Sequence, residues 1–219
     1  MRLIVGNKNY SSWSLRAWLL LRQAGIPFEE ESLSFNAADF DERVLRYSPA
    51  GRVPVLVDGE VAVWDSLAIA EYVAERFPKK TLWPESPAAR AHARAICAEM
   101  HAGFADLRSQ LPMNCEARFE RILPTLATRR DIERILAIWR DCRERNAAAG
   151  PFLYGRFTVP DAFFAPVVRR FLGHAVELSG TAAAYTRTID ELPAMREWMS
   201  AALAEHDYVA EDEPYRSAR

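Results

Sequence analysis

The hydrophobic pattern of the first 80 residues alternates between strand and helix periods. A short apolar run at residues 3–5 predicts a buried strand, and residues 28–33 alternate apolar and acidic positions, as an edge strand does. Between them, residues 15–24 carry apolar side chains at helical spacing, preceded by serines that could cap the helix and followed by Gly25 and Pro27. This stretch therefore predicts a strand, a helix and a second strand.

The pattern continues with a helix, a hairpin and a further helix. Residues 39–47 have helical spacing, and residues 66–77 form an amphipathic pattern that Pro78 closes. The runs 53–57 and 61–64 flank Asp58-Gly59, a pair that suits a tight hairpin turn. The order β-α-β-α-β-β-α predicts a small mixed sheet with helices on its faces.

Beyond residue 87 the pattern changes, and every periodic segment is helical. Helices are expected at 88–111, at 126–149, from Thr158 onward and at 193–203. The fold class is therefore α/β plus all-α, with one domain at 1–80, a proline-containing linker at 81–87 and an all-helical domain at 88–219. The charged tail after Asp207 is expected to be loose at its end.

Composition excludes several classes of function. The 219 residues are half hydrophobic and 26% charged, with a net charge of −2, which does not favour a nucleic-acid or membrane-surface binder. The densest arginine clusters, Arg129/Arg130 with Arg134 and Arg169/Arg170, are interpreted as solvated faces. No segment has the pattern of a signal peptide or the length of a membrane span, so we expect a cytoplasmic protein with no membrane partner.

The cysteines and histidines do not form a recognisable ligand pattern. Cys97, Cys115 and Cys142 are odd in number and contain no CxxC, which argues against a disulfide scaffold or a zinc site and fits a reducing cytosol. The four histidines show no metal-ligand spacing with acids or cysteines. No metal is expected.

Three local patterns carry candidate chemistry. The first is the serine-rich stretch from Asn9 to Arg16 between the first strand and the first helix. A helix N-terminus offers unpaired N–H groups and a partial positive charge, and hydroxyls there can donate to an anion. Plain N-capping by serine remains the alternative.

The second pattern is Gly51-Arg-Val-Pro-Val-Leu56, with Pro54 at the start of a strand. A cis bond before Pro54 would leave the backbone of Val53 facing outward, where it could pair with a peptide-like ligand. An ordinary trans proline is the alternative.

The third pattern is Trp64-Asp-Ser-Leu-Ala-Ile69, where the hairpin ends and a helix begins. Ser66 can cap that helix, and the N–H groups beside it can hold a carboxylate. Asp65 can hold an ammonium group next to it, so the pair suits an α-amino acid head. Capping alone explains the pattern equally well.

Together, in this order and spacing, the three patterns resemble the glutathione transferase family over the whole chain. The resemblance implies a thioredoxin-like N-terminal domain followed by an all-helical domain. Thr158-Val-Pro-Asp161 looks like the family's capping box, whose role is in folding. Ser-Ser-Trp-Ser-x-Arg is similar to the Ser-Ser-Cys-x-x-Arg of the zeta class, with Trp13 in place of cysteine, which puts the zeta-class isomerase reaction in doubt.

The resemblance also implies roles for individual residues. Ser11 would activate the thiol of glutathione, with Ser12 as the neighbour that could replace it. Val53, with Pro54 in cis, would bind the cysteinyl backbone, and Asp65 and Ser66 would bind the γ-glutamyl head. Arg52 stands where the family often places a polar residue near the glycine carboxylate. Glutathione is thus the expected co-substrate, and family members are usually homodimers.

A pocket for a small hydrophobic electrophile is expected between the domains. Its candidate residues are Tyr10, Trp13, His101, Phe104 and Arg108. The last three have helical spacing and are expected to share a face of the helix at 88–111. Core packing for Phe104 and solvent exposure for the others is the alternative.

Other functions stay open at this level. The same fold serves non-catalytic interaction or regulatory modules, including regulators that bind RNA polymerase, and these would be expected to lose the active hydroxyl or the γ-glutamyl pair. A glutathione-dependent peroxidase or isomerase is a further alternative, whereas a thiol-disulfide enzyme needs a cysteine at the first helix, where there is none. The transferase is preferred because Ser11, Asp65 and Ser66 are all present.

Overall fold

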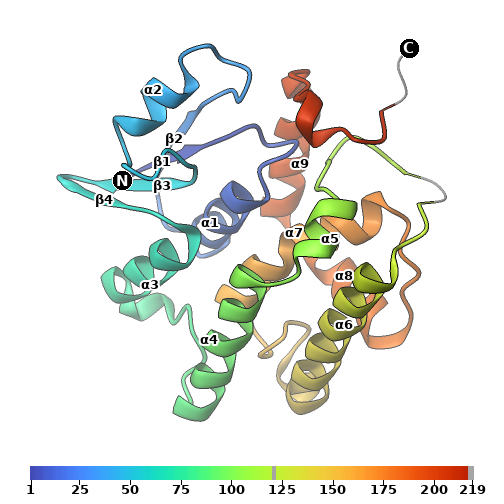
Figure 1. The fold of residues 1–219 in the computed structure, drawn as a ribbon. Helices are drawn as coiled ribbons and strands as arrows, with labels where there is room; N and C mark the ends of the chain where they lie inside the picture. The colour runs from blue at the N-terminus through green and yellow to red at the C-terminus, as the bar shows by residue number, and fades with distance from the viewer. Residues whose placement is uncertain (120–121, 217–219) are drawn as a thin grey trace.

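The computed structural model describes residues 1–119 and 122–216 and places a four-stranded mixed sheet at the N-terminal end (Figure 1). The strands are β1 (Arg2–Val5), β2 (Glu29–Ser32), β3 (Val55–Asp58) and β4 (Val61–Val63), in the order β2-β1-β3-β4. β1 pairs with β2 in parallel and with β3 antiparallel, and β3 and β4 form the hairpin. The predicted mixed sheet and its edge strand β2 are confirmed.

Three helices cover the two faces of this sheet. α1 (Ser12–Gln23) and α3 (Ser66–Arg76) lie on one face and α2 (Phe40–Leu45) on the other (Figure 1). The alternation of strand side chains explains the two layers: Leu3 and Val5 join the large core on the α1 side, whereas Ile4 joins a small cluster with Val44 of α2. The element order β-α-β-α-β-β-α is the predicted one.

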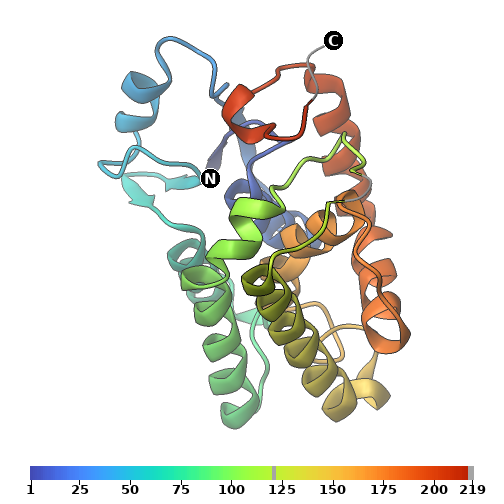
Figure 2. The same cartoon turned by 45° about the vertical axis from the view of Figure 1, so that its right-hand side comes forward.

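The second half of the chain is helical and continues the same core. Its elements are α4 (Pro87–Ala102), α5 (Ala105–Gln110), α6 (Leu126–Asn146), α7 (Val159–Gly173), α8 (Gly180–Asp190) and α9 (Pro193–Glu205), with short 3-10 turns at Pro78–Lys80, Ala147–Ala149 and Ala210–Asp212. α7 is buried along nearly its whole length and packs against α1 and α4. α7 therefore joins the sheet layer to the other helices, together with the contacts of α1 with α9 and of α3 with α4 (Figures 1 and 2).

Two helix predictions need correction. The expected single helix at 88–111 is divided into α4 and α5, because Phe104 adopts a left-handed conformation (φ 60°) directly after Gly103. A left-handed residue cannot continue a right-handed helix. α8 was not predicted at all: its sequence is rich in alanine and threonine, and only Tyr185, Thr186 and Ile189 are buried.

The predicted capping box opens α7. Asp161 Oδ2 accepts hydrogen bonds from the Thr158 amide (2.8 Å) and hydroxyl (3.1 Å), and Asp161 Oδ1 accepts from the Leu153 amide and the Tyr185 hydroxyl. The carboxylate is fully buried, so these donors replace its hydration. The box therefore fixes both the start of α7 and the loop before it.

Part of the C-terminal tail is held against the rest of the chain by hydrogen bonds. After α9, Asp207 accepts hydrogen bonds from Asn7 and Asn36, and Tyr215 donates to the Gln110 carbonyl at 2.6 Å. The tail up to residue 216 therefore packs against both halves of the chain, whereas the end that was expected to be loose, residues 217–219, lies outside the described residues.

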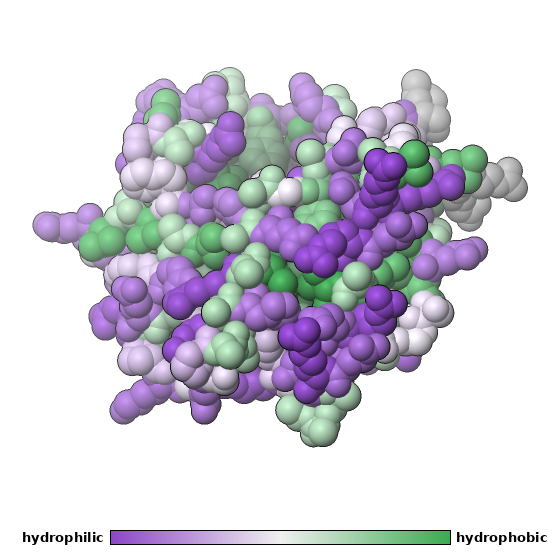
Figure 3. All heavy atoms as spheres, turned by 60° about the horizontal axis from the view of Figure 1, so that its bottom comes forward, coloured by the Kyte–Doolittle hydropathy of each residue, from purple (hydrophilic) through white to green (hydrophobic). Residues whose placement is uncertain are grey.

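None of the helices in the described ranges combines the length and the apolar composition that a membrane span needs. The face at the bottom of Figure 1 is largely hydrophilic, with apolar side chains visible mainly in the hollows between polar ones (Figure 3).

Candidate functional site

The serine-rich segment lies at the N-terminus of α1, as its sequence predicted. Ser11 is the N-cap residue, and its Oγ accepts from the Ser14 amide at 3.3 Å. The Ser11 and Ser14 hydroxyls are 2.7 Å apart, and Ser14 Oγ also accepts from the Gly6 amide at the end of β1. Ser11 thus has a structural role, whatever chemistry it also performs.

A cavity of about 360 Å³ opens beside these serines. Of the residues singled out in the sequence, it is lined by Tyr10, Ser11, Ser12, Trp13, Arg52, Val53 and Arg108. Seven further lining residues were missed: Phe35, Phe40, Gly51, Pro112, Met113, Arg170 and Asp212. The missed residues lie on loops and helices whose approach to the serines depends on the tertiary fold.

Arg170 is the most informative of the missed residues. Its Nη2 donates to Ser12 Oγ at 3.3 Å, and its Nη1 donates to the carbonyls of Arg108 and Leu111. Burial, reinforced by the nearby charge of Arg108, lowers the pKa of Arg170 to about 9, so the group stays charged at neutral pH. The interpretation of Arg169/Arg170 as a solvated face is wrong, since both side chains are buried on α7. Both arginines stand within a long apolar stretch of sequence, and this pattern could have indicated that they are buried.

Trp13 stands between three cationic or titratable groups. The Arg16 guanidinium lies 4.4 Å from the centre of the Trp13 ring and that of Arg108 lies 4.8 Å from it. The His101 ring meets Trp13 edge to face, with centroids 5.0 Å apart. Cation–π contacts of this kind stabilise buried guanidinium groups. Among the described residues, neither Arg16 nor Arg108 forms a salt bridge with a carboxylate.

A second cavity of about 410 Å³ adjoins the first. Trp13, Arg52 and Val53 line both, and the second continues along Ala50, Pro54, Trp64, Asp65, Ser66 and His101. The Val53–Pro54 bond is cis, as predicted. Within the described ranges, neither the amide nor the carbonyl of Val53 has a backbone hydrogen-bond partner. These groups are therefore open to a ligand.

The helix cap expected at Ser66 is instead Asp65 at the start of α3. Asp65 is the N-cap, and its Oδ1 accepts from the amides of Leu67 (2.9 Å) and Ala68 (3.3 Å). Ser66 is the first residue of the helix and caps nothing. Ser66 lines the second cavity, and its buried Oγ has no hydrogen-bond partner in the described part of the chain. A buried hydroxyl without a partner is a costly feature that a bound ligand can relieve.

The three residues expected on one face of the helix at 88–111 are separated. His101 lies in the last turn of α4 and lines the second cavity, where its Nε2 lies 3.1 Å from Asp65 Oδ2. Burial lowers the pKa of His101, while Asp65 acts in the opposite direction. Arg108, on α5, lines the first cavity, and Phe104 is buried and lines neither. The three residues are separated because the helix ends at Ala102 and a new helix begins after Phe104.

The C-terminal tail forms one side of the first cavity. The Tyr10 hydroxyl donates to Glu213, and Asp212 lines the cavity on the side of Arg170. Burial raises the pKa of Asp212, and the charge of Arg170 opposes that effect. Burial and the Glu213 carboxylate raise the pKa of Tyr10 well above its usual range, so its hydroxyl stays protonated.

Comparison with known proteins agrees with this architecture. Residues 10–76 match the family model for the N-terminal domain of glutathione S-transferase. A 60-residue stretch is 47% identical to dichloromethane dehalogenase of Methylorubrum extorquens, covering 26% of this chain and 21% of that protein. The stringent starvation protein A homolog of Haemophilus ducreyi is 27% identical over 169 residues, 77% of this chain and 74% of that one.

A solved glutathione transferase homolog from Burkholderia with bound glutathione has the same fold. Its TM-score is 0.69 at 19% identity, over 92% of this chain and 97% of the other. At this identity the likeness concerns the fold, which combines the thioredoxin-like sheet with a helical second half. Residues 10–76 therefore match the N-terminal domain of glutathione S-transferase, and the chain as a whole has the fold of the solved glutathione transferase homolog.

Proposed function

We propose that this protein is a glutathione transferase that activates the thiol of bound glutathione for attack on a small electrophile. The observation that carries the proposal is at Ser66, which lines the second cavity and whose buried hydroxyl has no hydrogen-bond partner among the described residues. It lies beside a carboxylate, Asp65, and in the same cavity as the open backbone of Val53. This set of groups suits a peptide with a free α-amino acid head.

Glutathione fits the second cavity group by group. The α-carboxylate of its γ-glutamyl head would accept from Ser66 at the N-terminus of α3, where the helix dipole favours an anion. Its ammonium group would face Asp65, and its cysteinyl amide would pair with the backbone of Val53. Arg52, which is exposed and lines both cavities, is placed for the glycine carboxylate.

The thiol of glutathione held in this way would lie where the two cavities join, next to the serines. Lowering the pKa of a thiol by about 2 units requires about 2.7 kcal/mol. One hydrogen bond to a charged group contributes about 1.5–3 kcal/mol, and a helix N-terminus about 0.3–1 kcal/mol. One serine hydroxyl at the start of α1 is therefore sufficient.

The contacts favour Ser12 over Ser11 as this donor. Ser12 Oγ accepts from Arg170, so its own hydrogen is free to point into the cavity. The Ser11 hydroxyl is 2.7 Å from Ser14 Oγ and caps α1, so Ser11 can serve only if Ser14 supplies the shared hydrogen. Sequence resemblance preferred Ser11, and the two assignments make different predictions for substitution.

The electrophile side of the first cavity is cationic as well as apolar. Arg108 and Arg170 line it together with Phe35, Phe40 and Met113. Buried cations are normally paired, and in the described ranges neither arginine forms a salt bridge. We therefore propose an electrophile that is apolar over most of its surface and carries a carboxylate. A glutathione-dependent isomerase acting on a carboxylated substrate would use the same groups.

The competing function is a non-catalytic interaction module, which the similarity to a stringent starvation protein A homolog keeps open. Calorimetry with glutathione separates the two. We expect binding to the wild type and clear weakening in Asp65→Ala, because the ammonium loses its counter-charge. Glu75→Ala, an exposed carboxylate on α3, should bind normally. Absence of binding to the wild type would reject the transferase. Homodimerisation and a cytoplasmic location stay predictions.

A further inference from the structure

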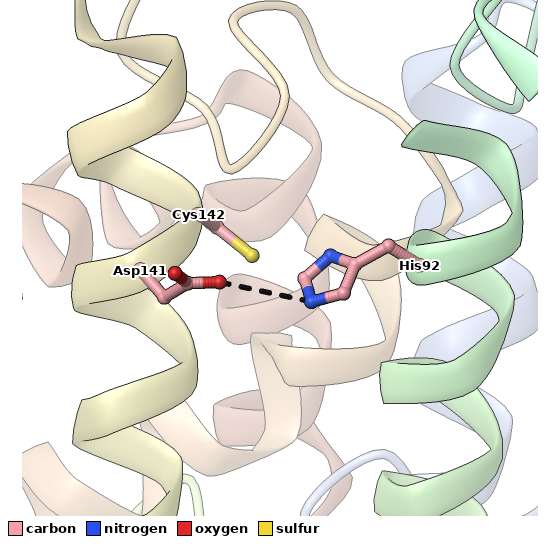
Figure 4. Close-up of side chains that lie close together, drawn as sticks. All are labelled: His92, Asp141 and Cys142. Atoms are coloured by element: carbon pink, nitrogen blue, oxygen red, sulfur yellow. Dashed lines mark ion pairs between the residues drawn. The ribbon is translucent and has the colours of Figure 1, made fainter. Parts of the chain in front are cut away.

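A second cluster of reactive side chains lies away from both cavities, between α4 and α6. His92 projects from α4 toward Asp141 and Cys142, which are neighbours on α6 (Figure 4). His92 is nine residues before His101 on the same helix, about 13 Å along its axis. We propose that these three side chains form a binding site for a divalent transition-metal ion, with Zn²⁺ the best match.

The donor atoms converge without hydrogen bonding to one another. His92 Nε2 and Asp141 Oδ2 are 3.7 Å apart, and one donor atom from each of the three residues lies within 4.8 Å of the others. Two ligands on a tetrahedral zinc ion are about 3.3–3.7 Å apart, given Zn–N, Zn–O and Zn–S bonds of about 2.0–2.3 Å. The side chains therefore need to close by on the order of 1 Å.

The remaining polar atoms of the cluster are already engaged. His92 Nδ1 lies 2.6 Å from the Tyr154 hydroxyl, which leaves Nε2 as the ring nitrogen open to a cation. Arg145 Nη2 lies 2.7 Å from Asp141 Oδ1, which leaves Oδ2 facing His92. Outer contacts that orient an imidazole and a carboxylate in this way accompany metal sites generally.

The chemistry of the donors selects the ion. Imidazole nitrogen and thiolate sulfur suit zinc and its neighbours, whereas magnesium and calcium prefer oxygen ligands throughout. On binding, the Cys142 thiol would release its proton to solvent, and the thiolate and carboxylate together would balance the two charges of the cation. The His92 and Asp141 side chains are 36% and 40% exposed, so the ion can enter and water can complete the coordination.

The test uses the whole chain, free of any affinity tag, stripped with a chelator and kept reduced with a phosphine instead of a thiol. Zn²⁺ is titrated against a chromophoric chelator, and Co²⁺ is added separately as a spectroscopic probe. We expect one equivalent of Zn²⁺ and a sulfur-to-cobalt charge-transfer band. Cys142→Ser should abolish the band, and Cys97→Ser, a buried cysteine on α4, should keep it.

Two variants at half-exposed positions guard against loss of folding. His92→Gln and Asp141→Asn should each weaken Zn²⁺ binding about tenfold or more, since even outer contacts of metal sites cost about 10–100-fold. Circular dichroism checks that both are folded. No charge-transfer band in the wild type, or unchanged Zn²⁺ affinity in both variants, would mean an adventitious ion only and would overturn the proposal. Neither outcome depends on glutathione binding.

Discussion

The guanidinium of Arg170 donates from Nη2 to the hydroxyl oxygen of Ser12 at 3.3 Å, although 158 positions separate the two residues. The contact ties buried α7 to the first turn of α1. Because Ser12 accepts this bond, its own hydrogen can be donated into the adjacent cavity, and the guanidinium polarises the hydroxyl it contacts. Arg170, in the helical half of the chain, therefore orients and polarises the hydroxyl of Ser12 in the half that contains the sheet.

The first prediction concerns the thiol. In the complex with wild type, bound glutathione should ionise about 2 units below a free thiol, and Ser12→Ala should raise that pKa by about 1–2 units. Ultraviolet titration of the thiolate measures both values. Glutathione affinity should stay within a few-fold, because Asp65, Ser66 and Val53 are untouched.

Ser11→Ala is the matched comparison. It should reduce stability by about 1 kcal/mol through loss of the α1 cap and leave the thiol pKa nearly unchanged. A larger pKa change in Ser11→Ala than in Ser12→Ala would return the role to Ser11. If neither substitution moves the pKa or the rate, the serine mechanism is wrong.

The second prediction concerns the electrophile. A pair of electrophiles that differ only by a ring carboxylate should be used unequally, with kcat/KM higher for the carboxylated one. Arg108→Gln should reduce that ratio about tenfold, because a hydrogen bond to a charged group is lost. Arg196→Gln, exposed on α9, should keep the ratio. Equal use of both electrophiles by the wild type would contradict a carboxylate site.

The third prediction concerns the capping box. Asp161→Ala should lower the free energy of unfolding by about 2–4 kcal/mol, since the cap is lost and the buried Leu153 amide is left without an acceptor. Urea denaturation measures the change. Asp106→Ala, exposed on α5, serves as the control and should stay within about 0.5 kcal/mol of wild type. A similarly small effect of Asp161→Ala would refute the role given to the box.

The fourth prediction concerns the tail and pH. Hydrogen bonds from Ser34, Asn7 and Asn36 lower the pKa of Asp207. A lowered pKa in the folded state contributes stability that is present above the ordinary carboxyl pKa of about 4 and is lost as pH falls through the lowered value. Asp207→Ala should therefore melt below wild type at pH 7.

The gap between the two melting temperatures should then shrink as the pH falls below about 4. Asp41→Ala, an exposed carboxylate on α2, should show no comparable gap at either pH. A gap that stays constant with pH would show that the ionised carboxylate of Asp207 is not what fastens the tail.

Local pattern determined the order of strands and helices along the first half of the chain and where the three candidate site segments begin. Periods of two and 3.6 residues, together with Asp58-Gly59, give the strands, the hairpin and the helices of the first half, because these signals act within a few residues. The serines at α1, the Val53–Pro54 step and the capping box at Thr158 are equally local. Their positions in the structure are those the sequence indicated.

Tertiary packing decided which residues meet. The helix break at Gly103 placed His101 with Asp65 and Arg108 with Ser12, although their spacing suggested one helical face. Arg170 entered the cavity because α7 is buried, and a charge pattern along the chain does not reveal that. His92 meets Cys142 only where α4 lies beside α6. Contacts between distant segments depend on how whole elements pack, so they become visible only once the chain is folded.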